Sequence, residues 1–274
     1  MTSTAGSTHR ARPLAIVTGA SVGIGEALAW ELAVHGYDLA LVARDRTRLD
    51  EVGAEIAGAH GITTTSVGLD LTDANAPEAL LEALGGRTDR LDVVVNNAGF
   101  GKFGPFSTIP VDDSDAMIQL NIAALTRLTR LVIPGMLKRG RGRILNVAST
   151  AAFQPGPRMA VYYATKAYVL SFSEALFEEL RGSGVTVTTL CPGPTKTEFH
   201  ARADMEDSAL LRKGWIMSAE KVARLGYRGM ARGKRVVTPG LANRLGTILG
   251  RISPRGFAAR VVYRLQAPRG RKTA

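Results

Sequence analysis

The sequence predicts an α/β fold, a doubly wound parallel sheet of seven strands with helices on both faces, as in Rossmann-like proteins. Short apolar runs alternate with longer helical patterns, which is typical of parallel βαβ units. Glycines directly after the first apolar run indicate a tight strand-to-helix turn. A chain of 274 residues, 45% of them hydrophobic, can bury the core of one such domain.

Each expected strand is a short run rich in Val, Ile, Leu or Thr, and each expected helix carries apolar residues three or four positions apart. Strands are expected near residues 14–18, 38–43, 62–68, 91–96, 141–148, 185–191 and 235–238. Helices are expected after the glycine turn and over residues 46–59, 76–84, 115–131 and 161–180. We therefore expect a disordered tail over 1–11, one domain over 12–240 and an extension over 241–274.

The first strand leads into a turn with the spacing G-x-x-x-G-x-G. Glycines allow close backbone approach, and the following helix offers free N–H groups and a positive dipole end to a pyrophosphate. A glycine turn without a ligand is the alternative, and the position after the first strand makes it the weaker one. The predicted nucleotide contacts here are Gly19, Ser21, Gly23, Ile24 and Gly25.

Tyr162 and Lys166 stand four residues apart in a helical pattern, so they share one helix face. A cation beside a phenol favours the phenolate, and we expect the pKa of Tyr162 to fall below its ordinary value. Such a tyrosine exchanges protons near neutral pH, and Ser149 could bind the same substrate oxygen. By itself the pair could equally be a core-edge residue and a solvated charge, but the nucleotide turn upstream favours chemistry.

Together these segments resemble the short-chain dehydrogenase/reductase family over about residues 13–240. The motifs that carry the resemblance are TGASVGIG at 18–25, Asp70-Leu71, Asn96-Asn97-Ala98-Gly99, Asn121, Ser149, Tyr162 with Lys166, and Pro192-Gly193 followed by Thr197. The resemblance implies hydride transfer between a nicotinamide nucleotide and a carbonyl or alcohol. It also implies a homodimer or homotetramer.

The resemblance assigns a role to each of four catalytic residues. Ser149 and Tyr162 bind the substrate oxygen, and Tyr162 donates or accepts its proton. Lys166 lowers the tyrosine pKa and binds the nicotinamide ribose. Asn121 holds a water that connects Lys166 to solvent.

The resemblance also assigns cofactor contacts beyond the glycine turn. Asp70 and Leu71 lie beside adenine, although an acid there could instead cap a helix. The segment Asn97, Ala98 and Gly99 lines the adenosine ribose. Contacts to the nicotinamide end come from Pro192, Gly193, Thr195 and Thr197, where Pro194 and the polar Thr195 depart from the usual pattern.

The end of the second strand reads Ala43-Arg44-Asp45 and bears on cofactor choice. A carboxylate there would bind a free ribose 2′-hydroxyl, whereas a 2′-phosphate needs cations. By resemblance, Ala43 stands where NAD-using members carry the acid, and Arg44 follows as in NADP-using members. Asp45 fits as the cap of the next helix. We therefore expect NADP(H) rather than NAD(H), with a solvated Arg44 as the alternative.

The expected substrate cleft is apolar, which predicts a hydrophobic ketone, aldehyde, acyl or lipid carbonyl. Its candidates are Phe100, Phe103, Phe106, Phe153, Met159 and the loop 198–217, with Arg158, Arg202, Arg212 and Lys213 near in sequence. The aromatics could equally be ordinary core. A catalytically silent nucleotide-binding sensor or scaffold is the alternative function, and the intact catalytic residues argue against it.

Positive charge gathers at the C-terminal end. Residues 212–274 hold 16 Lys or Arg and one acid, Glu220, whereas residues 1–211 carry a net charge of −4. Apolar residues alternate with arginines over 241–266, and Pro254 divides this stretch into two predicted helices. The segment could lie on an anionic membrane, cover the cleft or a subunit interface, or bind nucleic acid, and it carries no nucleic-acid motif.

Several absences narrow the expectations further. The histidines at 9, 35, 60 and 200 show no ligand spacing, so no metal site is predicted. The one cysteine, Cys191, follows an apolar strand and is expected to be a buried thiol. No secretory signal is visible, and we expect a cytoplasmic protein, with peripheral membrane contact through 241–274 left open.

Overall fold

The computed structural model describes residues 11–197 and 216–266, so nearly all of the predicted tail lies outside the described residues. Its centre is a seven-stranded sheet in the order β3-β2-β1-β4-β5-β6-β9, and every neighbouring pair is parallel. The strands are β1 (Leu14–Thr18), β2 (Asp38–Ala43), β3 (Thr64–Gly68), β4 (Leu91–Asn96), β5 (Gly142–Val147), β6 (Val185–Leu190) and β9 (Val236–Val237). This arrangement confirms the predicted doubly wound sheet.

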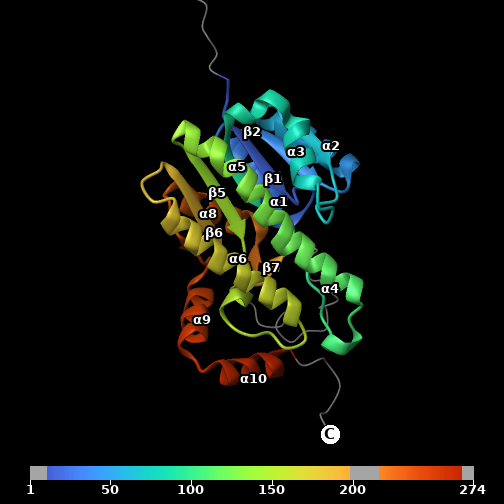
Figure 1. The fold of residues 1–274 in the computed structure, drawn as a ribbon, viewed down its shortest axis with the longest axis vertical. Coiled ribbons are helices and arrows are strands. Elements are labelled where there is room, and N and C mark those ends of the chain that lie inside the picture. The colour runs from blue at the N-terminus through green and yellow to red at the C-terminus, as the bar shows by residue number, and fades with distance from the viewer. Residues whose placement is uncertain (1–10, 198–215, 267–274) are drawn as a thin grey trace, which may run out of the picture.

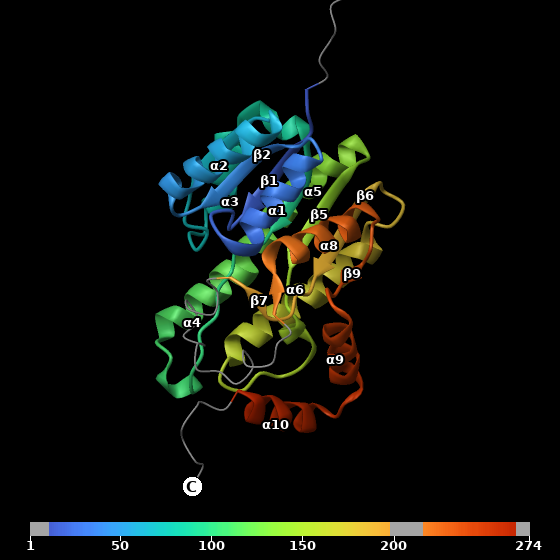
Figure 2. The same ribbon diagram turned by 180° about the vertical axis from the view of Figure 1, so that it is seen from behind.

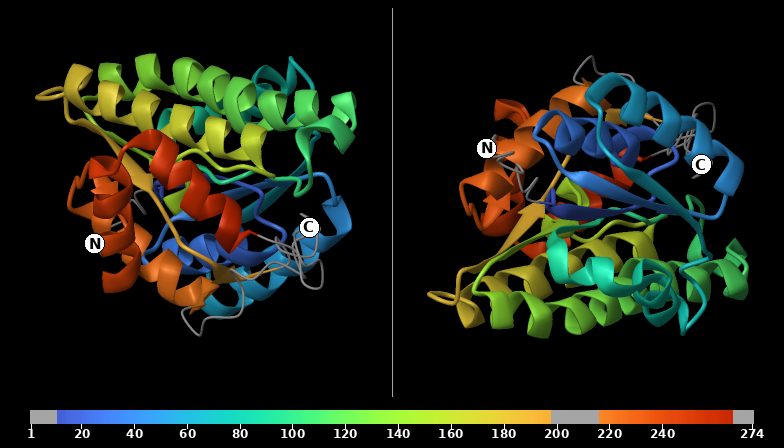
Figure 3. Two further views of the ribbon diagram at one scale, coloured as in Figure 1. Left: turned by 90° about the horizontal axis from the view of Figure 1, so that it is seen from below. Right: turned by 90° about the horizontal axis from the view of Figure 1, so that it is seen from above.

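Helices cover both faces of the sheet, as the end-on views of Figure 3 show. One layer contains α1 (Gly23–Val34), α2 (Arg46–His60) and α8 (Ala219–Ala231), and the other contains α3 (Ala76–Leu84), α5 (Leu125–Arg139) and α6 (Ala160–Glu179). Side chains alternate between the two cores along each strand, so that Val17 packs in one apolar cluster and Ile16 in the other. The central strand β1 and its neighbour β2 are largely apolar because both faces of the sheet are covered there.

One long helical stretch, Val111–Arg139, exceeds the predicted 115–131 at both ends. It consists of α4 (Val111–Ile118), the π-helical η3 (Gln119–Ala124) and α5. Among the described residues this stretch alone is long and apolar enough to cross a membrane by length and composition. Leu128, Val132 and Met136 are nevertheless buried in a cluster with strand residues, as in a core helix of a globular protein.

The C-terminal segment forms the two helices expected on either side of Pro254, α9 (Leu241–Ile252) and α10 (Arg255–Leu265). Figures 1 and 2 show them at one end of the molecule, beyond the sheet and next to the start of α6. α9 contacts η4 (Thr150–Phe153), the short helix that follows β5, so both helices lie near the carboxyl ends of the strands. The remaining short elements are η1 (Gly85–Arg90), η2 (Phe106–Thr108), β7 (Thr195–Lys196) and β8 (Met217–Ser218).

Candidate active site

In the turn after β1, the backbone at Gly19 and the backbone at Gly25 approach so closely that a side chain on Gly25 would clash. Gly19 has a φ of +65°, and a Cβ on Gly25 would lie 2.0 Å from the Gly19 carbonyl oxygen. Val22 precedes α1 and offers no side-chain hydrogen bond to its first turn. The N–H groups there therefore lack a side-chain cap, and together with the helix dipole they fit a pyrophosphate. Ser21 is half-buried in the same turn, and Ile24 packs against the core.

Thr18 and Asn97 fasten this turn to the end of β4. The Asn97 side chain donates to the carbonyl oxygens of Thr18 and Gly19, at 2.9 and 3.1 Å. The Thr18 hydroxyl accepts from the backbone N–H groups of Asn97 and Ala98, each at 3.0 Å. Thr18 begins the TGASVGIG motif, but its part in fastening the turn to β4 has no local signal, because Asn97 and Ala98 lie far along the chain.

Arg44 is exposed at the carboxyl end of β2. Asp45 caps α2 by accepting a hydrogen bond from the Arg48 N–H at 2.9 Å, as predicted. Asp70 accepts from the Thr72 N–H and hydroxyl at 2.9 and 2.8 Å. Burial raises the pKa of Asp70, but these hydrogen bonds and the nearby Arg44 charge outweigh it and lower the pKa overall. The Asp70 carboxylate therefore lies near the Arg44 guanidinium, the expected ligand of a 2′-phosphate.

The alternative for Asp70 was a helix cap, but the N-cap of α3 is Asn75. Leu71 is buried in the core beneath the sheet. Asp70 and Leu71 follow the end of β3. Because the Leu71 side chain is buried, any contact from this residue to a nucleotide has to come mainly from its backbone.

The segment after β6 approaches the glycine turn. The Thr197 methyl would lie 3.0 Å from a Cβ on Gly23, so the predicted phosphate and nicotinamide contacts are neighbours. Thr195 is buried, and its hydroxyl donates to the Gly193 carbonyl oxygen at 2.9 Å. Pro192 is buried beside them, and its carbonyl accepts from the Thr150 N–H at 2.9 Å.

Tyr162 and Ser149 are joined by a hydrogen bond at the start of α6. Burial raises the pKa of Tyr162 to about 12, although this hydrogen bond lowers it. The predicted fall in the tyrosine pKa is therefore wrong for the protein without nucleotide. Lys166 Nζ is 5.8 Å from the centroid of the Tyr162 ring, and the raised pKa of Tyr162 comes from desolvation of the phenolate.

Lys166 and Asn121 connect α6 to the loop after β4. The Lys166 ammonium donates to the Val147 carbonyl oxygen at 2.8 Å, and burial lowers its pKa to about 8. Asn121 donates to the Phe100 carbonyl at 2.9 Å and to the Thr165 hydroxyl at 3.0 Å, and accepts from the Phe100 N–H at 3.1 Å. It belongs to the π-helical turn, a distortion often found at functional sites.

Gly99 completes this arrangement. A Cβ on Gly99 would lie 2.8 Å from Asn121 Oδ1 and 3.4 Å from Lys166 Nζ. The structure thus brings together the four predicted catalytic residues, with Gly99 against two of them.

A buried polar network lies beneath the site. The Asn96 side chain donates to Asn146 at 2.8 Å and to Thr129 at 3.0 Å, and Asn146 donates to Ser173 at 2.8 Å. These bonds tie β4, β5, α5 and α6 together below the catalytic residues. No local pattern indicates these partners of Asn96, because they are distant in sequence.

An apolar cluster surrounds Tyr162 and includes a side chain from the C-terminal extension. Its members are Met117, Ala151, Met159, Tyr162, Tyr163 and Val262, with Phe100, Phe103 and Val161 packed against them. Phe106 is 66% exposed, and Phe153 packs in a different cluster. These two phenylalanines thus lie outside the cluster around Tyr162, and their place in the substrate cleft stays a prediction. Of the expected loop, 198–215 lies outside the described residues, as do Arg202, Arg212 and Lys213.

The end of α10 is attached to the start of α6 by hydrogen bonds and by one stacking contact. Gln266 is fully buried, and its side chain donates to the Tyr163 hydroxyl at 2.8 Å. The Arg158 guanidinium donates to the Gln266 carbonyl at 2.7 Å and stacks over the Tyr263 ring. α10 thus forms a wall beside Tyr162, one of the options that the sequence left open for this segment.

A family model described as short chain dehydrogenase matches residues 13–207. The very-long-chain 3-oxoacyl-CoA reductase of Homo sapiens is 36% identical over 182 residues, which are 65% of this chain and 58% of that protein. The chain therefore spans less than two thirds of that relative's length.

Two solved structures share the fold. The short-chain dehydrogenase from Sphingobium yanoikuyae in complex with NADPH is 33% identical, with a TM-score of 0.77 over 87% of this chain and 92% of its own. The bulky-bulky ketone specific alcohol dehydrogenase from Comamonas testosteroni is 30% identical, with a TM-score of 0.75 over 86% and 90%.

Proposed function

This chain belongs to the short-chain dehydrogenase/reductase family, and we propose that it is an NADP(H)-preferring oxidoreductase of hydrophobic carbonyl or alcohol substrates. The observation that carries the proposal is the placement of Ser149, Tyr162, Lys166 and Asn121 in one connected site. The glycine turn that fits a pyrophosphate lies at the same edge of the sheet. A nicotinamide nucleotide, when bound, supplies or accepts the hydride.

Tyr162 acts as the acid in the reductive direction. Ser149 and Tyr162 hydrogen-bond the carbonyl oxygen, on which negative charge develops as the carbon accepts a hydride. The phenolic O–H bond breaks, its proton moves to that oxygen, and an alcohol forms. Because the pKa of Tyr162 is about 12, the phenol is protonated at neutral pH and ready to donate. Oxidation follows the same steps in reverse.

Lys166 restores the proton. Its ammonium is buried and its pKa of about 8 lies near neutrality, so it can give up a proton at low cost. Asn121 holds the backbone of Phe100 on one side and Thr165 of the catalytic helix on the other. In the proposed role it keeps open the path along which Lys166 exchanges its proton with solvent.

Arg44 supports the preference for NADP(H). It is an exposed cation at the carboxyl end of β2, where a 2′-phosphate needs positive charge. The acid beside it, Asp45, is occupied as the cap of α2. NAD(H), whose free 2′-hydroxyl favours a carboxylate, is the weaker candidate.

The apolar cluster around Tyr162 supports a hydrophobic substrate. Met117, Met159 and Val262 belong to the same apolar cluster as Tyr162, and none of these side chains could bind a charged group. Two relatives are named for an acyl-CoA ketone and for bulky ketones, which accords with this choice.

A carbonyl panel tests the proposal. Purified protein is mixed with NADPH and with ketones and aldehydes of increasing apolar size, and NADPH oxidation is followed by absorbance. We expect turnover that rises with apolar size and is absent without a carbonyl compound. Tight NADPH binding with no turnover on any substrate would favour the silent sensor.

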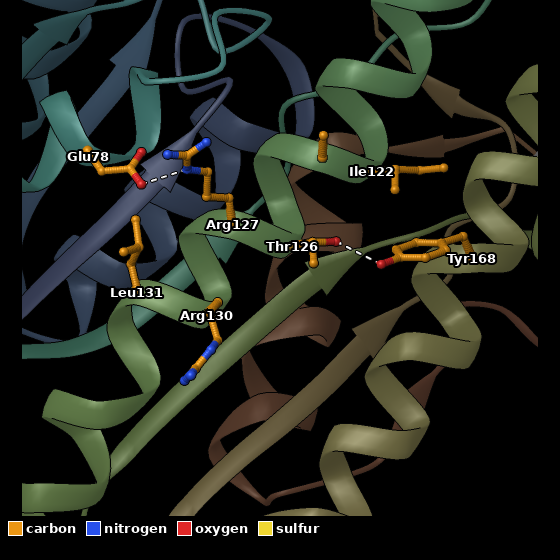
Figure 4. A pocket seen from close by; sticks show the side chains of 8 residues that line it. Glu78, Ile122, Thr126, Arg127, Arg130, Leu131 and Tyr168 are labelled. Carbon is orange, nitrogen blue, oxygen red and sulfur yellow. Dashed lines mark hydrogen bonds and ion pairs between the residues drawn. The ribbon is translucent and has the colours of Figure 1, made fainter.

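We also propose that two copies pair through the outer face of α5 and α6. A groove there is lined by Ile122, Leu131 and Tyr168 together with Glu78 and Arg127 (Figure 4). The Arg127–Glu78 ion pair at 2.6 Å and the Thr126–Tyr168 hydrogen bond at 3.0 Å cross it. Apolar side chains among charges of both signs suit contact with an identical surface.

The cytoplasm is the proposed location. The one cysteine of the chain, Cys191, is buried as predicted, and burial raises the pKa of its thiol to about 12. An inert buried thiol fits a reducing compartment, where disulfides are rare.

A further inference from the structure

Helix α9 presents its apolar face to solvent. Leu241, Leu245, Ile248, Leu249 and Ile252 are 75%, 54%, 48%, 59% and 73% exposed. Successive helical residues are about 100° apart, so these five side chains fall within an arc of about 100°. A helix packed on a globular protein normally turns such a stripe toward the core. We call these five residues the α9 apolar stripe.

The opposite face of α9 packs on the protein, and it is small and polar. Thr247 is buried, and its hydroxyl donates to the Arg244 carbonyl at 2.8 Å. Asn243 donates to the Pro239 carbonyl at 2.8 Å and lies against Gly193. Gly250 lies against Gln154 and Phe153 of the segment after β5. Together with the contact between Asn243 and Gly193, this holds the helix in its orientation and leaves the apolar stripe outside.

Exposed positive charge lies on the two C-terminal helices. Arg244, Arg255, Arg260 and Arg264 are exposed on α9 and α10, and the chain contains no acid after Glu220. Arg251 is excluded from this set, because it pairs with Glu174 at 3.6 Å and stacks on Phe153. Phe257 and Val261 add exposed apolar area on α10.

We propose that the α9 apolar stripe and its flanking arginines dock the protein on an anionic lipid surface. Apolar side chains would enter the interface between headgroups and acyl chains, and the arginines would pair with anionic headgroups. A second copy of the chain is a poorer partner for this surface. In a symmetric dimer the arginines of one copy would face those of the other, and their charges would repel. The occupant must therefore carry negative charge.

The docking surface adjoins the candidate active site. The inner face of α10 places Val262 in the cluster around Tyr162, and Gln266 holds the Tyr163 hydroxyl. Docking would thus bring an apolar cleft close to the lipid, which provides a route for a hydrophobic substrate. That route rests on the proposed function, whereas lipid binding does not and is measured without turnover.

Vesicle flotation with the full chain tests the proposal. The probes are phosphatidylcholine vesicles with and without 30% phosphatidylglycerol. We expect binding only to the anionic vesicles and its loss between 0.1 and 0.5 M salt, where screening is strong. The variant Leu245→Ser/Ile252→Ser should lower the partition coefficient at least about tenfold. The variant Arg244→Gln/Arg255→Gln/Arg260→Gln should lower it on the order of 100-fold.

Two controls remove exposed side chains of the same kinds at the amino ends of the strands, away from α9 and α10. Val34→Ser removes an exposed apolar side chain at the end of α1. Lys138→Gln/Arg181→Gln/Arg232→Gln removes three exposed cations ahead of β5, β6 and β9. Both controls should bind like the natural chain.

Three results would overturn the proposal. The first is no binding of the full chain to anionic vesicles at low salt. The second is an equal loss of binding in the charge variant and its matched control. The third is a halved mass for the Leu245→Ser/Ile252→Ser variant in light scattering with vesicle binding unchanged, which would assign the stripe to a second copy.

Discussion

At the scale of single residues, the proposed reaction depends on the phenolic oxygen of Tyr162. Tyr162→Phe removes the proton donor and keeps the ring that packs in the apolar cluster. Activity should fall by at least about 10²-fold, the contribution expected of a positioned acid, while NADPH affinity changes little. Tyr227→Phe makes the same change on α8, where the ring stacks on His35, and serves as the control. Turnover like that of the natural enzyme in the Tyr162 variant would remove this residue from the mechanism.

Lys166 should impose a pH dependence on the nucleotide-free protein. Its pKa is lowered to about 8 by burial, so the ammonium is present below that pH and lost above it. The kcat/KM for NADPH reports the free enzyme and should fall as pH rises above about 8. Tyr162, with a pKa of about 12, stays protonated throughout this range. Lys166→Arg, which keeps its charge, should abolish the inflection, and an unchanged inflection in that variant would assign it elsewhere.

Arg44 should distinguish the two nucleotides. Arg44→Ala should weaken NADPH binding by about 10-fold or more and NADH binding much less, since only NADPH would lose a charge-assisted phosphate contact. Arg46→Ala is the matched control, because Arg46 is already paired with Asp50 at 3.2 Å. Titration by nucleotide fluorescence measures both affinities. Equal losses for NADPH and NADH would show that Arg44 does not select the phosphate.

At the scale of elements, the end of α10 acts as a clamp on the catalytic helix. Gln266→Ala removes a buried hydrogen bond to Tyr163 and should cost about 1–3 kcal/mol of unfolding free energy in urea. It should also raise the KM for an apolar ketone, because the wall beside Tyr162 loosens. Arg264→Ala changes an exposed residue of the same helix and should do neither. A Gln266 variant as stable as the natural chain would show that the clamp does not hold α10.

At the scale of the whole molecule, the groove on α5 and α6 predicts a dimer. Leu131→Arg adds a third cation beside Arg127 and Arg130, and it should shift the mass in light scattering from dimer to monomer. Leu137→Arg adds the same charge at an exposed position of α5 outside the groove and should leave the mass unchanged. A monomeric natural chain would contradict the proposed pairing.

The sequence located individual residues where a local pattern exists. Asp45 lies directly before a helical pattern, and the structure has it capping α2. Asn146 and Gln266 have no local pattern, because each acts through a partner far along the chain. The hydrogen bonds of Thr18, which begins the glycine motif, were hidden for the same reason. The π-helical turn at Asn121 was missed for a related reason, since its apolar spacing resembles that of an ordinary helix.

By itself the sequence determined the parallel sheet, the glycine turn and the two helices divided at Pro254, because periodicity, glycine geometry and proline act within a few residues. Only the tertiary structure decided the pKa of Tyr162, which depends on burial by distant segments and on the hydrogen bond with Ser149. It alone decided that α9 turns its apolar stripe outward while α10 packs into the apolar cluster that contains Tyr162. An amphipathic pattern specifies that one face is apolar, but what that face meets is settled by the packing of the opposite face.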